Sequence, residues 1–279
     1  MRLRGIRRSR NVEVRGGSRM GGAAGGLGIA GVLFVLAVGY FTGIDVTPLL
    51  QGSGSVGSQQ TTAEEVQNDP ATQFSAQVLA TTEDVWSTVF EEQLGRDYVP
   101  PQLVVFSGMT QSPCGGASGA TGPFYCPLDS KAYLDTQFFD MLSQRMGADG
   151  DFAAAYVIAH EVAHHVQNEL GILPKVNAAR QRASQTEANA LTVRLELMAD
   201  CLSGVWARNV QGLLEPGDIQ EALNAARKIG DDYLQRQAGR VPQPHTFTHG
   251  TSEQRARWFS NGYETGSVGQ CDTFATDRL

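Results

Sequence analysis

Two histidines and a glutamate near the middle of the chain have the residue types and the spacing that predict chemistry. His160, Glu161 and His164 occur in the sequence HEVAH. On a helix, positions i and i+4 share one face, so both imidazoles can reach one tetrahedral zinc ion. Glu161 follows the first histidine directly, where its carboxylate can reach a water on that ion. The motif therefore predicts a zinc hydrolase in which Glu161 is the catalytic base.

The alternative is a pair of surface histidines on an amphipathic helix. The residues around the motif are apolar on every side, namely Tyr156, Val157, Ile158, Ala159, Val162 and Ala163. A buried His-Glu-His cluster with no metal leaves polar groups without partners, which costs considerable free energy. The apolar surroundings therefore favour the zinc site.

A third ligand is expected on a later segment, because a catalytic zinc usually takes three protein ligands and leaves one position open. The extended pattern HExxHxxGxxH is absent, and no cysteine pair has ligand spacing. Glu196 and Asp200 are again i and i+4, within the sequence ELMAD. We predict that Glu196 binds the metal and that Asp200 accepts the outer N–H of a zinc histidine, in the first place His160. A solvated acidic pair is the alternative, and the apolar residues between them favour burial.

A hydrolase of this kind also needs a donor for the oxyanion that develops beside the metal. His249 stands in a loop just before a predicted helix and is our candidate for a catalytic role, with Tyr263 as a second choice. Arg255 is predicted to support His249 or to bind a substrate carboxylate. A helix-capping or surface role for His249 stays open. His165 points about 100° away from His164 and is predicted to pack.

Long helices are predicted to carry these residues. One runs from about Phe152 to Leu170 after a capping segment at Asp149–Asp151, and Gly171 ends it. The next, from Ser184 to Val210, carries Glu196 and Asp200. Two further helices are expected to begin with capping boxes, formed by Asp218 with Glu221 and by Thr251 with Gln254.

Strands are expected in front of these helices. Gln102–Ser107 reads as a short apolar strand, and Lys131–Leu134 as another that could form the sheet edge along which a peptide pairs. The predicted fold class is therefore α+β, mostly helical, with a small sheet.

The N-terminal part of the chain predicts membrane anchoring. No charged residue occurs from Met20 to Ile44, a length that can span a bilayer as a helix. Seven arginines precede this segment and Asp45 follows it, which predicts a cytoplasmic N-terminus and a catalytic domain outside the cytoplasm. A cleaved signal peptide is the main alternative, although no good cleavage site follows the apolar run. A buried core helix is a further alternative.

The predicted organisation has four parts. They are a basic cytoplasmic tail at 1–20, a transmembrane anchor at 21–44, a flexible linker at 45–69 and the zinc domain at 70–279. The linker assignment rests on its Gly, Ser, Gln and Thr content. The acidic body, in a chain of net charge −7, argues against a nucleic-acid partner.

Four cysteines are consistent with an oxidising compartment, where an even number usually means disulfides. Cys114 and Cys126 flank a Gly-rich loop and are predicted partners, which leaves Cys201 with Cys271. Four buried free thiols are the alternative.

Three segments together resemble a known family. HEVAHHVQ, ELMADCLSGVWA and THGTSEQRARWFSNGY look like the bacterial family of neutral zinc metallopeptidases, and CGGASGATGPFYCPLDSKAYLD is similar to its cysteine loop and following strand. The resemblance covers about residues 70–272. It implies a zincin-like domain with a gluzincin-type site, HExxH plus ExxxD, similar to that of thermolysin-like peptidases. It also implies that the domain cleaves peptide or protein substrates.

Two other classes of function stay open at this point. In one, the domain is a non-catalytic envelope module with a structural zinc, although such sites usually fill all four positions with protein ligands and have no need of Glu161. In the other, the chain is a membrane-linked chaperone or adaptor without metal. The peptidase is the predicted function, with His160, His164 and Glu196 as the ligands.

Overall fold

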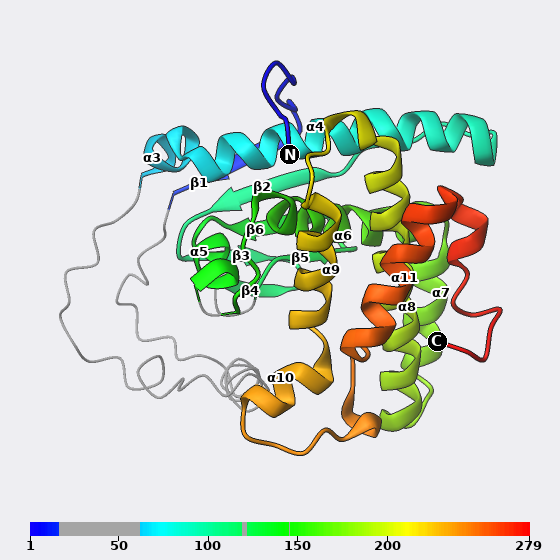
Figure 1. Ribbon diagram of the computed structural model, residues 1–279. Helices are drawn as coiled ribbons and strands as arrows, with labels where there is room; N and C mark the ends of the chain where they lie inside the picture. The colour runs from blue at the N-terminus through cyan, green and yellow to red at the C-terminus, as the bar shows by residue number, and fades with distance from the viewer. Residues whose placement is uncertain (17–61, 119–121, 145) are drawn as a thin grey trace, which may run out of the picture.

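Helix α6 (Asp151–Glu169) carries the HEVAH motif and runs through the middle of the computed structural model, which describes residues 1–16, 62–118, 122–144 and 146–279 (Figure 1). Every residue from Phe152 to Ala163 is buried, as expected for a helix that is apolar on all sides. The helix begins after Gly150 and stops at Leu170, and Gly171 takes the left-handed conformation that favours glycine. The predicted bounds of this helix are therefore confirmed to within one residue.

A four-stranded sheet packs against α6. Its strand order is β1 (Val12–Arg15), β2 (Gln102–Phe106), β6 (Lys131–Asp135) and β5 (Phe124–Cys126). The first three strands are parallel, and β5 is antiparallel to β6. Strand β6 is therefore internal, so the prediction that Lys131–Leu134 forms the sheet edge was wrong. The edge on that side is β5, which lies against α6.

The two faces of the sheet bury different clusters, because successive side chains point to opposite faces. Leu103 and Val105 of β2 join the main core with α6 and with α4 (Pro70–Val89). Val104 and Phe106 join a smaller cluster with Cys126 on the other face. The sheet thus divides the hydrophobic residues between a large helical layer and a small second layer.

The remaining elements surround this centre (Figure 1). They are helices α3 (Ala63–Asn68), α5 (Gln137–Gln144), α7 (Ile172–Arg180), α8 (Gln185–Asn209), α9 (Asp218–Lys228), α10 (Asp231–Gln237) and α11 (Ser252–Thr265), a π-helical turn η1 (Phe90–Leu94), the 3-10 turns η3 (Gln211–Leu213), η4 (Pro244–Thr246) and η5 (Val268–Cys271), and a hairpin of β3 (Met109–Ser112) and β4 (Gly115–Ser118). The described part of the domain is α+β and mostly helical, as predicted.

Helix α8 packs more extensively on α11 than on any other element. The two backbones can approach closely because a glycine stands on each side of the contact. A Cβ on Gly204 would lie 2.1 Å from the carbonyl oxygen of Phe259, and one on Gly262 would lie 1.8 Å from that of Cys201. Both helices begin with capping boxes, Ser184 with Glu187 in α8 and the predicted Thr251 with Gln254 in α11.

The capping box predicted at Asp218 and Glu221 was wrong. Helix α9 begins after Gly217 and has no side-chain cap. The Glu221 carboxylate instead accepts the backbone N–H of Phe152 at 3.1 Å, in the first turn of α6. Glu221 thus satisfies a free donor at the start of the helix that carries the motif.

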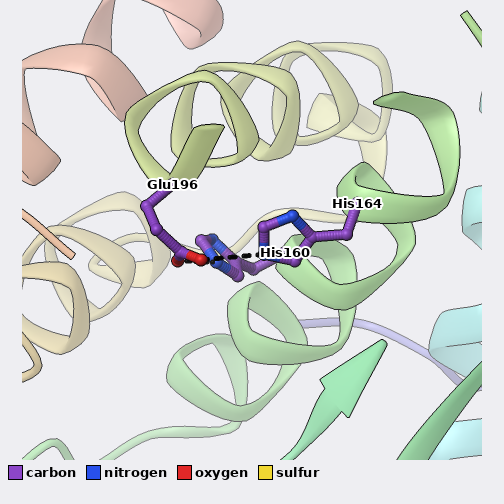
Figure 2. Close-up of side chains that lie close together, drawn as sticks. All are labelled: His160, His164 and Glu196. Carbon is purple, nitrogen blue, oxygen red and sulfur yellow. Dashed lines mark hydrogen bonds and ion pairs between the residues drawn. The ribbon is translucent and has the colours of Figure 1, made fainter. Parts of the chain in front are cut away.

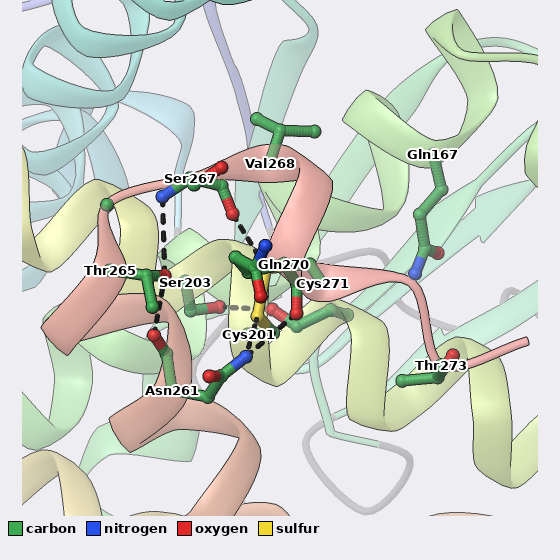
Figure 3. Close-up of a disulfide and its surroundings, with 12 residues drawn as sticks. Gln167, Cys201, Ser203, Asn261, Thr265, Ser267, Val268, Gln270, Cys271 and Thr273 are labelled. Carbon is green, nitrogen blue, oxygen red and sulfur yellow. Dashed lines mark hydrogen bonds between the residues drawn. A yellow bond between two sulfur atoms is a disulfide. The ribbon is translucent and has the colours of Figure 1, made fainter. Parts of the chain in front are cut away.

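Both predicted disulfides are present. Cys114 and Cys126 join the β3–β4 hairpin to strand β5, with their Cα atoms 5.8 Å apart. Cys201 and Cys271 join α8 to η5, with their Cα atoms 5.5 Å apart (Figure 3). The second bond is attached to the residue that follows Asp200, so it holds the C-terminal segment against the part of α8 that carries the candidate site.

The predicted fold class was wrong in one part, the transmembrane helix. No helix within the described ranges has the length and apolar character needed to cross a membrane. The segment assigned to it, residues 21–44, lies outside the described residues. Strand β1 pairs in parallel with β2 along its whole length, from Val12 opposite Leu103 to Arg15 opposite Phe106. A single crossing at 21–44 would put these two paired strands on opposite sides of a bilayer.

Further contacts attach residues 1–16 to the rest of the domain. The α-amino group of Met1 lies 2.7 Å from an Asp151 carboxylate oxygen at the start of α6. Farther along, the Glu83 carboxylate of α4 accepts hydrogen bonds from Arg7, Ser9 and Asn11. Residues that were expected to form a separate basic tail are therefore part of the structure around the motif.

Substitution of Gly262 by alanine should destabilise the domain, because the added methyl group overlaps the Cys201 carbonyl and forces α8 and α11 apart. We expect a loss of about 1–3 kcal/mol in the free energy of unfolding, measured by denaturant titration. Gly212→Ala is the matched control, since its Cβ meets no atom within 4 Å. Equal stability of the two variants would contradict the close contact.

Candidate metal centre

The structure brings His160, His164 and Glu196 together between α6 and α8 (Figure 2). Glu196 lies 3.1 Å from the Nε2 atom of His160 and 3.4 Å from that of His164, with one carboxylate oxygen facing each ring. One ligand atom from each of the three residues lies within 4.8 Å of the others. The i and i+4 histidines and the glutamate of the next long helix thus lie together, and their role as metal ligands stays a prediction.

Electrostatics favours an anionic Glu196. Burial raises the pKa of a carboxyl group, but the charges of His164 and His160 outweigh this effect and hold the pKa of Glu196 well below its ordinary value. Burial acts in the opposite direction on His160, yet the adjacent Asp200 and Glu196 raise its pKa to about 9. The cluster is therefore a buried place where positive charge is stabilised.

The outer nitrogen of His160 is held by Asp200, as predicted. His160 Nδ1 lies 2.9 Å from Asp200 Oδ1, and the Asp200 side chain is completely buried. The same carboxylate accepts hydrogen bonds from the Tyr156 hydroxyl at 2.5 Å and from the Arg255 guanidinium at 2.9 Å through both Nε and Nη2. Burial alone would raise the pKa of Asp200. The opposite effect of Arg255 and His160 is larger, so the pKa lies below its ordinary value.

Arg255 lies behind Asp200 and is not exposed to a substrate. Its side chain is only 1 % exposed, and it also donates to the Ile229 carbonyl. We predicted that Arg255 supports His249 or binds a substrate carboxylate. Its contacts are with Asp200, Tyr156 and the Ile229 carbonyl instead. Arg255 instead balances the charge of the carboxylate that orients His160.

Glu161 is buried beside the cluster, with 9 % of its surface exposed. In the part of the chain that the structure describes, its carboxylate has no hydrogen-bond partner. Burial raises the pKa of Glu161, while His164 and His160 act in the opposite direction. The carboxylate oxygens are not among the fully buried side-chain atoms that lack a partner, so water or a cation in the site can supply the missing interactions.

His249 lies in the loop between η4 and α11. Both of these elements contact α8. Its side chain is 47 % exposed, and Nδ1 lies 3.5 Å from Asp231 Oδ1. Desolvation lowers the pKa of His249, but Asp231 and the nearby charge of Glu196 raise it above its ordinary value. The effect of Glu196 on this pKa indicates that the His249 imidazole lies within electrostatic range of the cluster.

The other two residues considered from the sequence lie elsewhere. The backbone of Tyr263 packs against Gly204, roughly 12 Å along α8 from Glu196 at the rise of a helix. His165 is buried and lies between the Tyr125 hydroxyl of edge strand β5, at 3.0 Å, and the Val99 carbonyl, at 2.7 Å. It packs, as predicted.

Sequence reasoning missed three residues that contact the site. Gln167 faces the outer nitrogen of His164, and Tyr156 donates to Asp200. Asp231 accepts the backbone N–H groups of Thr248, His249 and Gly250 with one oxygen. Gln167 and Tyr156 stand three and four positions from a ligand on the same helix, so helical spacing could have identified them. Asp231 gave no local signal.

The HExxH motif on α6 and the glutamate on α8 converge in the arrangement that is typical of HExxH zinc sites with a glutamate as the third ligand. A family model described as "Putative neutral zinc metallopeptidase" matches residues 1–274, and the chain belongs to this family.

Relatives share most of the chain. The uncharacterized protein YpfJ of Escherichia coli (strain K12) is 49 % identical over 286 residues, which cover 98 % of this chain and 99 % of that protein. The uncharacterized protein Rv2575 of Mycobacterium tuberculosis (strain H37Rv) is 44 % identical over 195 residues, which cover 65 % of each chain. No solved structure matches the chain significantly.

The residues present fit the zinc ion that the family description implies. Two imidazole nitrogens and one carboxylate oxygen converge, which is the donor set of a catalytic zinc site. Each histidine is held at its outer nitrogen, His160 by Asp200 and His164 by Gln167. Such outer contacts usually accompany zinc histidines and fix their orientation.

Replacement of Glu196 by alanine should abolish zinc binding, because it removes the only anionic group among the three predicted ligands. We expect about one zinc per chain in the wild type and a small fraction of that in the variant, measured by elemental analysis of the purified full chain. Circular dichroism should show that the variant is folded. Full zinc occupancy in a folded variant would remove Glu196 from the ligand set.

Proposed function

We propose that the protein is a zinc metallopeptidase that hydrolyses peptide bonds, with His160, His164 and Glu196 as the metal ligands. The observation that carries the proposal is the Glu161 side chain, which is 9 % exposed, lies beside the three ligands and has no hydrogen-bond partner among the described residues. A structural zinc site has no need of such a group.

The mechanism assigns each side chain a separate task. When bound, zinc supplies a Lewis acid that polarises the scissile carbonyl and lowers the pKa of a coordinated water toward ~7. Glu161 takes the proton from the attacking water and delivers it to the leaving amine. Burial raises the pKa of Glu161 above its ordinary value, although His164 and His160 act in the opposite direction. A raised pKa brings the carboxyl group closer to neutral pH, where a general base is most effective.

His249 is the proposed donor to the developing oxyanion. Asp231 accepts three consecutive backbone N–H groups around it and lies close to its Nδ1 atom. This leaves Nε2 as the ring atom that can donate to a substrate. A donor that is held in place before the reaction needs no reorganisation in the transition state. This preorganisation is the main source of oxyanion stabilisation.

The expected substrates are peptides or proteins, and the expected compartment is an oxidising one. The two disulfides support such a compartment, since disulfides persist there and are rare in the cytosol. Strand β1 belongs to the sheet of the domain, and residues before it contact α4 and α6, so we place residues 1–16 on the same side as the catalytic site.

Glu161→Gln should keep the zinc and lose the activity. The amide cannot accept the proton of water, and loss of a general base lowers turnover by about 10²–10⁴-fold. The measurement is hydrolysis of a quenched fluorescent peptide library, together with zinc content. Glu169→Gln, at the end of the same helix, is the matched control. A fully active Glu161 variant would exclude the proposed mechanism, and inactivity of the zinc-loaded wild type on all substrates would favour a structural zinc.

His249→Phe should lower kcat by about 10²–10³-fold while zinc content is unchanged, because the ring is an oxyanion donor and not a ligand. His245→Phe is the control, since His245 lies four residues earlier, in η4, and its backbone carbonyl, not its side chain, makes the contact to Asn189. Steady-state kinetics on the same peptide compares the two variants. Similar rates in both would assign His249 to the loop structure alone.

A further inference from the structure

Gln167 is completely buried on α6, three positions after His164, and its side-chain amide lies between two polar groups. Its Oε1 atom lies 2.9 Å from His164 Nδ1, and its Nε2 atom donates to the Leu195 carbonyl at 2.7 Å. Leu195 precedes Glu196 on α8. One amide therefore joins a predicted ligand on α6 to the residue beside a predicted ligand on α8.

Only one assignment of donors and acceptors is consistent with the two hydrogen bonds of the Gln167 amide. A backbone carbonyl can only accept, so the amide must turn its NH₂ group toward Leu195. Its oxygen then faces His164, and an amide oxygen can only accept as well. His164 Nδ1 must therefore carry a proton, and in the neutral ring the lone pair is then on Nε2. That is the atom that faces Glu196, at 3.4 Å.

We propose that Gln167 is a positioning residue for metal binding, which sets the Nδ1–H tautomer of His164 and fixes its ring relative to Glu196. The inference deepens the proposed function and rests on it, because it concerns the zinc site of the same enzyme. The Leu195 carbonyl is part of the α8 backbone and cannot change its role. The tautomer of His164 is thus determined by the neighbouring helix through one side chain.

The two histidines are held in chemically different ways. His160 donates to a carboxylate, which the buried Arg255 neutralises, whereas His164 donates to an uncharged amide. A second buried carboxylate at position 167 would face His164 and the Leu195 carbonyl, with no arginine among these hydrogen-bond partners, and would have to be protonated or balanced by the metal. An amide supplies the same acceptor without that cost.

The test compares two substitutions at position 167 in the full chain. Gln167→Met keeps the volume and removes the acceptor, and we expect a zinc affinity 10–100-fold weaker, measured by competition with a chelator. Gln167→Glu keeps an acceptor, and in its protonated form also a donor to Leu195, so its affinity should be closer to that of the wild type. Val166→Ala is the matched control, because Val166 is the adjacent buried residue of the same helix and its side chain has no hydrogen-bonding group, so the variant opens a cavity without removing an acceptor.

Nitrogen-15 NMR of the imidazole rings gives a second readout that a purely structural role would not change. In the zinc-loaded wild type, His164 should show a protonated Nδ1 and a metal-bound Nε2. The opposite pattern in the wild type overturns the inference, even if Gln167→Met does not fold. So does a folded Gln167→Met variant with wild-type affinity, or a Gln167→Glu variant as weak as Gln167→Met. Wild-type protein that binds no zinc refutes the proposed function itself, which is a separate result.

Discussion

The ion pair between Asp200 and Arg255 is the interaction on which the rest of the site depends. Both side chains are almost completely buried, and each would be very costly there without the other. Asp200 gains four hydrogen bonds in this position, from the Tyr156 hydroxyl, from His160 Nδ1 and from Nε and Nη2 of Arg255. The pair fixes α8 to α11 and α8 to α6 at the same point. The orientation of His160 is therefore a consequence of how three helices pack.

That packing has its own requirements along α8. The contact with α11 needs Gly204 and Gly262, since a side chain at either place would overlap backbone atoms of the other helix. One turn before Gly204, Cys201 is bonded to Cys271 of the C-terminal segment (Figure 3). Farther toward the N-terminus, Thr273 donates to the Arg194 carbonyl, two residues before Glu196. The C-terminal segment thus holds α8 on both sides of the residues that face α6, which keeps Glu196 and Asp200 in register with the histidines.

The centre of the site could be predicted from the sequence because its residues follow helical spacing. His160 with His164 and Glu196 with Asp200 are i, i+4 pairs, so each pair shares one face wherever its helix lies. The disulfides followed from the number and placement of the cysteines. What failed depends on tertiary contacts that have no local pattern. Glu221 caps a helix distant in sequence, Arg255 pairs with Asp200 across a helix interface, and β6 is internal because β5 adds beyond it.

The position of β1 was the largest difference, and its cause is physical. Short strands paired in parallel to partners far along the chain leave no periodic signal, whereas an apolar run after seven arginines leaves a strong one. Parallel neighbours in a sheet must be joined by a connection that runs from the carboxyl end of one strand back to the amino end of the next, and residues 16–101 separate the two strands here. The chain leaves β1 at Arg15 and is again part of this domain by α3. A pattern within either segment alone therefore could not show that Val12–Arg15 and Gln102–Phe106 belong to one sheet.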